Sequence, residues 1–409
     1  MSGPHFHLEC RGCGSVVEPG TVDYRCAACG DEYVVRYVAG RAPLGAAPAA
    51  GMWRFAERLP LADLAHAVSL GEGDTPLVEL PAGPLGVASV RVKCEHLNPT
   101  GSFKDRIASV ALSIARERGL AGCVGTSSGN GGAAAAAYAA AAGLTCALFA
   151  LADTAEQKLL QIRALRASVH LVTGLGHDAA ATDAAARTIA GIAAETGLMP
   201  MLTGGRFSPE AMEGAATIAY EILDRAPGTT VVYAPVGGGG LVSAIGRGFA
   251  NAAGAPGTGG RGPRVVGVQP AGCPTLRAAL DGDLGGLTGP CETGVSGLQV
   301  AILFDGRGAV EAVRGSGGHL TEVTDEQIHA AQRALAGAGL LVEPAGATAY
   351  AGALADAAAG RLGPDDRVVL VATGAGYKDS AALARLADGP PPRRITADQI
   401  REAIAHAAS

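Results

Sequence analysis

Two patterns alternate along most of the chain, and this alternation constrains the fold more than any other feature of the sequence. Short runs rich in β-branched residues are separated by Ala-rich stretches that are long enough to form helices. Strands that alternate with helices build βαβ units, whose strands lie parallel in an open sheet. We therefore predict a mainly parallel α/β fold over about residues 53–386. Its expected strands include Val90–Val92, Ser168–Val172, Val231–Tyr233, Val265–Val268 and Val368–Val371.

Length and charge narrow the possible function classes. The 409 residues are enough for two or three domains with a large buried core. The formal net charge of −6 gives no electrostatic reason to expect nucleic acid or an anionic membrane as a partner. The uncharged run from Gly129 to Ala152 is mostly Ala and Gly, which predicts a helix that stops at Gly143 and a following strand rather than a membrane span. The first residues lack the basic and apolar segments of a signal peptide, so we expect a cytoplasmic protein.

The N-terminal segment, residues 1–38, carries a cysteine pattern of its own. Cys10-x-x-Cys13 and Cys26-x-x-Cys29 are separated by 12 residues, which is typical of a zinc ribbon. Four thiolates complete a tetrahedral shell, so the expected zinc is structural. Four free thiols or two disulfides are the alternatives, and disulfides are disfavoured in a reducing compartment. The other cysteines are predicted to be single core residues, namely Cys94, Cys123, Cys146, Cys273 and Cys291.

The C-terminal segment is set apart by composition. A glycine and three prolines at 389–392 interrupt the α/β pattern. Thr396 and Gln399 then have the spacing of a capping box, which predicts a short helix over residues 397–407. We therefore expect a helical tail at 389–409.

One lysine lies where it can serve a buried site. Lys104 follows Pro99 and Gly101, which bend the chain after the predicted strand Val90–Cys94, and the residues from Ile107 onward indicate a helix. A lysine held at such a turn can form an imine with a carbonyl group and later move protons. Most isolated lysines are surface charges, so the assignment depends on what surrounds this one.

Three glycine-rich turns accompany the lysine, each directly after a predicted strand. Free N–H groups at the start of a helix bind anions, and glycine lets a phosphate approach the backbone closely. Each turn alone is weak evidence, but the C-terminal ends of parallel strands are where open α/β sheets bind ligands. The three turns are Ser127–Gly131, Gly237–Gly240 and Thr373–Asp379.

Taken in order, six motifs resemble the fold-type II enzymes that depend on pyridoxal 5′-phosphate (PLP). The motifs are GEGDTPL at 71–77, NPTGSFKDR at 98–106, SSGN at 127–130, GGGGL at 237–241, EPAGA at 343–347 and TGAGYKD at 373–379. The chain resembles the threonine synthase and serine/threonine dehydratase group most. The resemblance implies a tryptophan synthase β-like fold with a larger domain at 40–122 and 204–388, a smaller domain at 123–203, and a homodimeric assembly.

The resemblance also implies a role for each motif residue. Lys104 carries PLP as a Schiff base, and Ser128 is a proton donor on the opposite face. The expected cofactor-binding residues are Lys104, Phe103, Asn130 at the 3′-oxygen, Gly237, Gly238, Gly239 and Gly240 at the phosphate, Glu343, and Thr373 at the pyridine nitrogen. The expected substrate carboxylate site consists of Ser127, Ser128, Gly129 and Gly131.

The motifs leave the substrate open. Threonine synthases carry an Asn-Pro-x-Arg-x-x-Gly segment that helps to bind the substrate phosphate, and here Ser208 and Ala211 stand at the Asn and Arg positions. Loss of a bidentate guanidinium weakens phosphate binding unless Arg206 or Arg163 replaces it. After SSGN the usual Thr or Ser is absent, and the pair at 131–132 is Gly-Gly, which predicts a roomier and less polar substrate site.

These observations predict a PLP-dependent carbon–oxygen lyase of amino-acid metabolism. It would eliminate or replace a group at the β or γ carbon of a small amino acid. Threonine synthase, which converts O-phosphohomoserine to threonine, is the leading named activity. A serine/threonine dehydratase or a cysteate synthase-like β-replacement enzyme, an amino-acid racemase, and a zinc-ribbon interaction protein with an inactive PLP fold are the alternatives.

Overall fold

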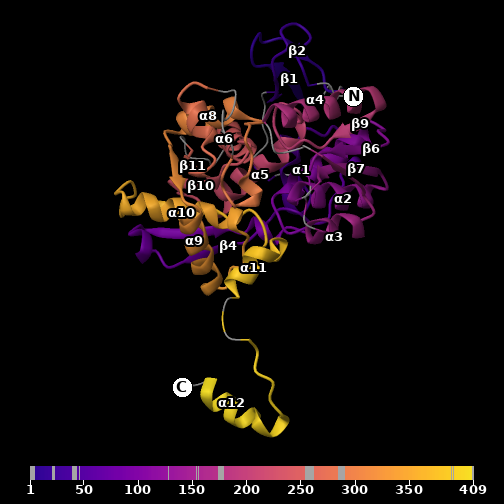
Figure 1. Cartoon of the computed structure of the whole chain (residues 1–409). Coiled ribbons are helices and arrows are strands. Elements are labelled where there is room, and N and C mark those ends of the chain that lie inside the picture. The colour runs from indigo at the N-terminus through magenta and orange to yellow at the C-terminus, as the bar shows by residue number, and fades with distance from the viewer. Residues whose placement is uncertain are drawn as a thin grey trace.

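The computed structural model describes residues 5–20, 24–38, 44–45, 47–127, 129–152, 154, 156–173, 179–253, 262–283, 291–387, 389 and 391–407. Within these ranges the strands form three sheets of three, six and four strands. The two larger sheets are mainly or wholly parallel, and helices pack against them (Figure 1). The mixed α/β architecture predicted from the alternating pattern is therefore confirmed. The predicted domain boundaries stay a prediction.

The six-stranded sheet has the order β12-β11-β10-β13-β5-β4, and only β4 runs antiparallel to its neighbour. Its strands are β4 (Leu77–Leu80), β5 (Ser89–Lys93), β10 (Val231–Pro235), β11 (Arg264–Pro270), β12 (Leu320–Val323) and β13 (Arg367–Val371). The four-stranded sheet has the order β8-β7-β6-β9. Its strands are β6 (Gly122–Gly125), β7 (Thr145–Leu151), β8 (Ser168–Val172) and β9 (Leu198–Pro200). All five strand runs predicted from the sequence lie in these strands.

Alternating side chains of the six-stranded sheet face two separate helical layers. Val232 and Val369 pack into a core with helices α1, α5 and α6, whereas Tyr233 and Leu370 pack into a core with α9 and α10. The helices of these layers are α1 (Lys104–Glu117), α5 (Pro209–Arg225), α6 (Gly240–Ala252), α8 (Gly306–Ser316), α9 (Asp325–Gly337) and α10 (Pro344–Ala358). The sheet is thus buried on both faces, as parallel sheets are.

Three helices accompany the smaller sheet, namely α2 (Asn130–Ala142), α3 (Glu156–Ala164) and α4 (Ala179–Thr196). Helix α2 ends at Gly143, whose φ of 68° is left-handed, and β7 follows at once. The uncharged run is therefore a helix and a strand, as predicted. Among the described residues, no helix is both long enough and apolar enough to cross a membrane.

The N-terminal ribbon contains β1 (Phe6–Cys10), β2 (Val16–Val17) and β3 (Tyr33–Tyr37) in the order β2-β1-β3. It lies at one end of the molecule, shown in indigo in Figure 1. Its tyrosines fasten it to α5: the Tyr24 hydroxyl donates to Glu210 Oε2 at 2.6 Å, and the Tyr37 hydroxyl donates to Glu213 Oε2 at 3.1 Å. The ribbon is thus joined to the same helical layer that contains α1.

The predicted C-terminal helix is present. A 3₁₀ turn at Ala397–Gln399 leads into α12 (Ile400–Ala407), and Thr396 and Gln399 form the expected capping box. Figure 1 shows α12 standing clear of the rest of the molecule. The remaining short helices are Gly51–Arg58, Leu64–His66, Gly83–Leu85, Glu95–Leu97, α7 (Thr275–Leu280), Ser296–Leu298, Gly376–Lys378 and α11 (Ser380–Leu386).

Two details differ from the sequence predictions. Helix α1 begins at Lys104 itself, three residues before the expected start, because the turn at Gly101 already completes the reversal of the chain. Cys273 and Cys291 are joined by a disulfide, and Cys123 lies directly opposite Cys146 on the neighbouring strand, so these four cysteines do not lie singly in the core. Local sequence patterns reveal neither pairing.

Candidate active site

Lys104 is the first residue of α1, at the C-terminal edge of the six-stranded sheet. Its amine donates a hydrogen bond to Thr203 Oγ1 at 2.8 Å and lies 4.8 Å from the centre of the Phe103 ring. Burial lowers the pKa of Lys104 to about 8, because the charged amine loses its water. About half of this amine is therefore neutral near pH 8, and a neutral amine can attack a carbonyl group or accept a proton.

Thr203 was not identified from the sequence. It lies in the loop between β9 and α5, away from every recognised motif. A Cβ atom placed on Gly131 would lie 3.8 Å from Thr203 Cγ2, and one placed on Gly240 would lie 3.3 Å from the Thr203 carbonyl oxygen. Thr203 thus joins the lysine to two of the three predicted glycine-rich turns. Those neighbours come from α1, α2 and α6, so no pattern of adjacent residues predicts the contact between Thr203 and Lys104.

The third turn, at Thr373–Asp379, lies against the starts of α2 and α10 beside the buried carboxyl group of Glu343. Asn130 Nδ2 donates to Glu343 Oε1 at 2.8 Å. A Cβ atom on Gly374 would fall 2.1 Å from Glu343 Oε1 and 2.9 Å from Asn130 Nδ2, so all three residues are in close contact. Burial raises the pKa of Glu343 to about 7, although Lys378 and the Asn130 hydrogen bond oppose the change. This carboxyl group therefore changes charge near neutral pH.

Backbone pairing holds the lysine turn against the end of β13. The Phe103 N–H donates to the Thr373 carbonyl oxygen at 3.0 Å, and the Ala375 N–H donates to the Gly101 carbonyl oxygen at 2.9 Å. Thr373 itself is almost fully buried. The predicted ring-binding residue and the predicted cofactor lysine are consequently fixed relative to each other by main-chain contacts.

Within the Gly237–Gly240 turn, Gly239 requires glycine because of its backbone conformation and a nearby carbonyl oxygen. Gly239 has a φ of 85°, and a Cβ atom there would lie 2.9 Å from the Asp305 carbonyl oxygen. Helix α6 begins at Gly240, so its first N–H groups have no acceptor in a preceding helical turn. N–H groups at the start of a helix suit a phosphate. The residues present therefore fit the phosphate end of PLP.

The predicted substrate turn is only partly described. Ser128 lies outside the described residues. The Gly129 N–H donates to Ser127 Oγ at 3.3 Å, and a Cβ atom on Gly131 would lie 3.2 Å from the same oxygen. At Gly132 an added Cβ would lie 2.3 Å from the Ser127 carbonyl oxygen and 2.9 Å from Ile162 Cδ1. The expectation of a roomier site is therefore wrong at Gly132, where glycine is needed for close packing of α2.

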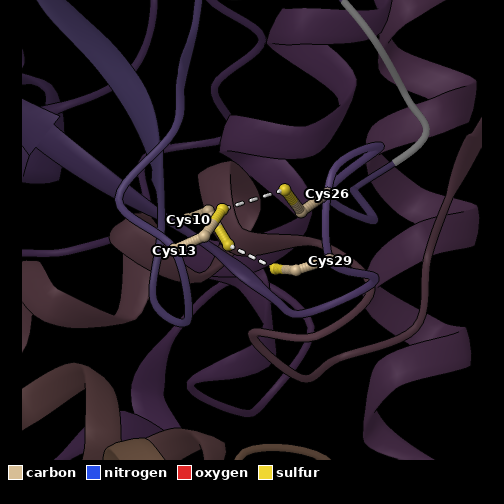
Figure 2. A group of neighbouring side chains, drawn as sticks. All are labelled: Cys10, Cys13, Cys26 and Cys29. Carbon is tan, nitrogen blue, oxygen red and sulfur yellow. Dashed lines mark hydrogen bonds between the residues drawn. The ribbon is translucent and has the colours of Figure 1, made fainter.

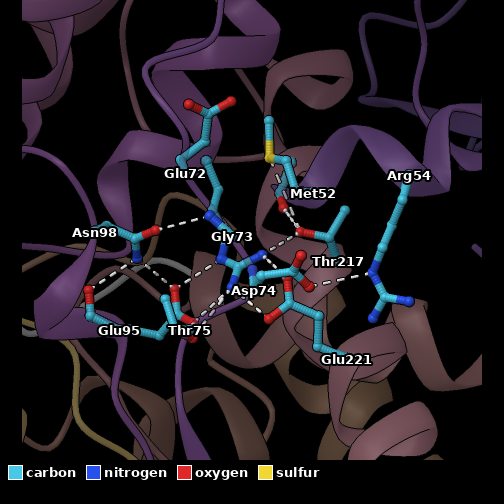
Figure 3. A network of polar contacts seen from close by, with 12 residues as sticks. Met52, Arg54, Glu72, Gly73, Asp74, Thr75, Glu95, Asn98, Thr217 and Glu221 are labelled. Atoms are coloured by element: carbon cyan, nitrogen blue, oxygen red, sulfur yellow. Dashed lines mark hydrogen bonds and ion pairs between the residues drawn. The ribbon is translucent and has the colours of Figure 1, made fainter. Parts of the chain in front are cut away.

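A buried ionic network lies at the start of α1, close to Lys104 in the chain (Figure 3). Arg106, in the first turn of α1, donates to Glu95 Oε2 at 2.7 Å and to Glu221 Oε1 at 2.7 Å. Lys93 also pairs with Glu221, and all four charged side chains are fully buried. Thr75 and Asn98 donate to the Glu95 carboxylate, so further hydrogen bonds satisfy its oxygens. The network joins β5, α1 and α5, and it fixes the start of the helix that carries Lys104.

The residues considered for substrate-phosphate binding lie apart from Lys104 or are engaged elsewhere. Ser208 Oγ donates to the Pro200 carbonyl oxygen at 2.7 Å, and Ala211 is fully buried in the main core. Arg206 pairs with Asp183 at 3.2 Å, and Arg163 pairs with Glu156 at 3.3 Å. In this structure each arginine is thus paired with a carboxylate, in ion pairs that are exposed or partly exposed.

The four ribbon cysteines form a separate cluster (Figure 2). Their sulfur atoms all lie within 4.8 Å of one another, with Cys10 and Cys29 at 3.4 Å and Cys13 and Cys26 at 3.6 Å. A tetrahedral zinc with Zn–S bonds of about 2.3 Å requires four sulfur atoms at such separations. The donor set and its spacing therefore fit zinc. Cys10 and Cys26 are buried and the other two are exposed.

Comparison with known proteins agrees with this arrangement. The family described as "Pyridoxal-phosphate dependent enzyme" matches residues 68–374. The threonine synthase of Methanocaldococcus jannaschii is 34% identical over 353 residues, which cover 83% of this chain and 84% of that protein. The threonine synthase of Methanosarcina acetivorans is 32% identical, with 98% of each chain covered.

Solved structures give the same fold. The threonine deaminase of T.th. superposes with a TM-score of 0.60 at 28% identity, covering 74% of this chain and 92% of that one. A threonine deaminase from Solanum lycopersicum has a TM-score of 0.64 at 24% identity, covering 77% and 82% of the two chains. Together with the family match over more than half of the sequence, these similarities place the protein: it belongs to the pyridoxal-phosphate dependent enzymes of fold type II and has threonine synthases among its homologues.

Proposed function

We propose that this protein is a carbon–oxygen lyase or synthase that uses Lys104 to hold PLP and to move a proton at the α-carbon of a small amino acid. The observation that carries the proposal is the partly buried Lys104 amine, which donates to Thr203, a residue beside the turns at Gly131 and Gly240. A lysine whose pKa is lowered toward neutrality is suited to act as a base. Threonine synthase is the leading named activity.

The neighbouring groups have separate tasks in this proposal. When bound, PLP withdraws electrons from the substrate α-carbon. Asn130 would bind its 3′-oxygen, and the Gly237–Gly240 turn would hold its phosphate. The neutral hydroxyl of Thr373 would serve the pyridine nitrogen and would leave it largely unprotonated, which would make the ring a milder electron sink. The turn at Ser127–Gly131 binds the substrate carboxylate through N–H groups and hydroxyls.

We further propose that O-phosphohomoserine is a poor substrate relative to its use by an orthodox threonine synthase. Ser208 and Ala211 replace the expected phosphate ligands, and Arg206 and Arg163 are paired with carboxylates. Loss of a hydrogen bond to a charged group costs about 1.5–3 kcal/mol, which is roughly 10- to 150-fold in binding. Ala211→Arg would place a guanidinium in the packed core, so kinetics of the wild-type enzyme give the cleaner test.

The test is a comparison of kcat/KM for O-phosphohomoserine, serine, threonine and phosphoserine, following release of phosphate, ammonia and 2-oxoacid. We expect phosphohomoserine turnover to be weaker by about 10- to 150-fold than in an orthodox threonine synthase assayed in parallel. Lys104→Ala provides the inactive baseline. Efficient threonine formation that collapses in Arg206→Ala would contradict the proposal and restore an ordinary phosphate site.

A second candidate is a serine/threonine dehydratase. It is favoured by the similarity to the T.th. threonine deaminase at 28% identity. Release of ammonia and a 2-oxoacid from serine or threonine, without phosphate chemistry, distinguishes it from the leading candidate.

We also propose that Cys10, Cys13, Cys26 and Cys29 hold one structural zinc. The support is the mutual spacing of their sulfur atoms, and four protein ligands leave no open position for catalysis.

A further inference from the structure

The loop that carries Thr203 is rigidly packed. A Cβ atom on Gly204 would fall 2.4 Å from Phe304 Cβ, and one on Gly205 would fall 2.7 Å from Asp305 Oδ2. The N–H groups of Phe207 and Ser208 both donate to the Gly204 carbonyl oxygen at 3.0 Å. Such close contacts leave the backbone that carries Thr203 little freedom.

The Lys104 side chain, by contrast, has a flexible four-carbon stem and is attached only at the start of α1. A bond between the amine and PLP would restrain the side chain. With the cofactor bonded to the substrate instead, the Lys104 amine would be free. It must then stay close to the α-carbon to act as a base, and a misplacement of about 1 Å costs on the order of 100-fold in rate.

We propose that Thr203 is the positioning residue for this free amine: its hydroxyl holds Lys104 Nζ beside the substrate turn, ready to remove the α-proton. The inference rests on the proposed function of Lys104. The 2.8 Å contact joins Nζ to a hydroxyl whose neighbouring methyl group faces Gly131 of the substrate turn. In the step itself the α-proton moves to Nζ, which becomes an ammonium group, and the C–H electron pair stays with the substrate and cofactor.

The hydroxyl can be removed without the other contacts of Thr203. Valine keeps the methyl group that faces Gly131 and the carbonyl that faces Gly240, and it loses only the group that contacts the lysine. Loss of the hydroxyl should therefore slow proton transfer and leave KM nearly unchanged. A hydrogen bond from an ammonium also favours the charged amine, so its loss should move the acidic limb of the kcat–pH profile to lower pH.

The test compares holoenzymes of wild type, Thr203→Val, Thr203→Ser and the control Thr321→Val. Thr321 lies on β12, where its hydroxyl donates to Asp356 at 2.8 Å. For each protein, cofactor content, the lysine labelled by borohydride, the exchange of the serine α-hydrogen with solvent deuterium by NMR, and kcat and KM are measured. We expect Thr203→Val to slow α-hydrogen exchange by about 10- to 150-fold, with Thr203→Ser and Thr321→Val close to wild type.

Equal exchange rates in wild type and Thr203→Val would overturn the inference, and so would a Thr203→Ser enzyme as slow as Thr203→Val. Loss of bound cofactor in Thr203→Val, with retention in Thr203→Ser, would also overturn it, because Thr203 would then hold PLP rather than the amine. A wild-type enzyme labelled at another lysine would refute the proposed function of Lys104 as well.

Discussion

The Glu343 carboxyl group of the candidate site changes charge near neutral pH. Its pKa is raised to about 7, above the ordinary value, so the folded protein holds this proton more tightly than the unfolded chain does. The folded state therefore loses stability as pH rises from the ordinary carboxyl range through about 7. Because Asn130 donates to Glu343, a change in the charge of Glu343 should alter the hydrogen bond that we expect between Asn130 and the cofactor's 3′-oxygen.

We predict that Glu343→Gln abolishes a transition near pH 7 in the absorbance of the bound cofactor. Glutamine has the shape of the protonated acid and still accepts the Asn130 hydrogen bond, but it does not titrate. The melting temperature of the variant should rise relative to wild type as the pH is raised from the ordinary carboxyl range through about 7. The exposed Glu79→Gln serves as the control. A variant that keeps the spectral transition would show that another group causes it.

The second prediction at the scale of single residues concerns Gly132. An alanine methyl there would overlap the Ser127 carbonyl oxygen, with a separation of 2.3 Å, so Gly132→Ala should destabilise the protein by about 1–3 kcal/mol. Gly191 is a matched control, because it lies inside α4 with open space at its Cβ position. Gly191→Ala should stabilise by about 0.5–1 kcal/mol. Denaturant unfolding measures both, and a neutral Gly132→Ala would revive the idea of a roomy pocket.

Among the elements, α1 is the one that connects stability with function. Its first residue is Lys104, and Arg106 in its first turn is held by two carboxylates, Glu95 from the short helix after β5 and Glu221 from α5. Fully buried charges of this kind are costly to separate, which makes the arrangement stiff once it has formed. A stiff helix start gives the lysine a defined position at the sheet edge. The sequence motif NPTGSFKDR therefore combines the reactive residue with part of its own support.

The ribbon provides the prediction at the scale of elements. Two ion pairs join the ribbon to α8. Asp31 pairs with Arg307 at 2.6 Å, and Arg11 pairs with Glu311. The Asp31–Arg307 pair is partly exposed, and exposed pairs contribute only about 0–1 kcal/mol each, so a change in the ribbon should reach α8 weakly through this pair. We predict one zinc per chain and, on chelation, a much larger loss of ribbon stability than of catalysis.

The measurements are zinc content by atomic absorption, thermal unfolding and kcat/KM, before and after chelation. Cys13→Ser should reduce the zinc content, whereas Cys146→Ser, a free cysteine outside the cluster, should not. Freshly purified reduced protein without zinc would count against the prediction, and so would a metal whose removal stops catalysis directly.

At the scale of the whole molecule, the sequence predicted what local chemistry determines. The strand runs, the Gly143 stop, the terminal capping box and the paired cysteines each depend on residues close together in the chain. The glycine turns were recognisable because glycine is needed where backbone and ligand approach closely.

Contacts between residues far apart in the chain could not be predicted from local sequence patterns. Thr203 meets Lys104 across 99 residues, and Cys273 meets Cys291 through a loop that carries α7. The packing that requires Gly132 depends on Ile162 from α3. Each of these needs the folded chain, since none is marked by spacing or by residue type alone.

The central claim is that Lys104, set among the three turns, is the lysine that binds PLP. Borohydride reduction of the holoenzyme, followed by peptide mass spectrometry, tests it most directly. We predict that the cofactor label is found on Lys104 and that Lys104→Ala lacks the long-wavelength absorbance of bound PLP. The charges of Lys158 and Lys378 act on Glu343, so these two lysines serve as controls. The variants Lys158→Ala and Lys378→Ala should keep that absorbance. A label on Lys158, Lys378 or any other lysine would contradict the account.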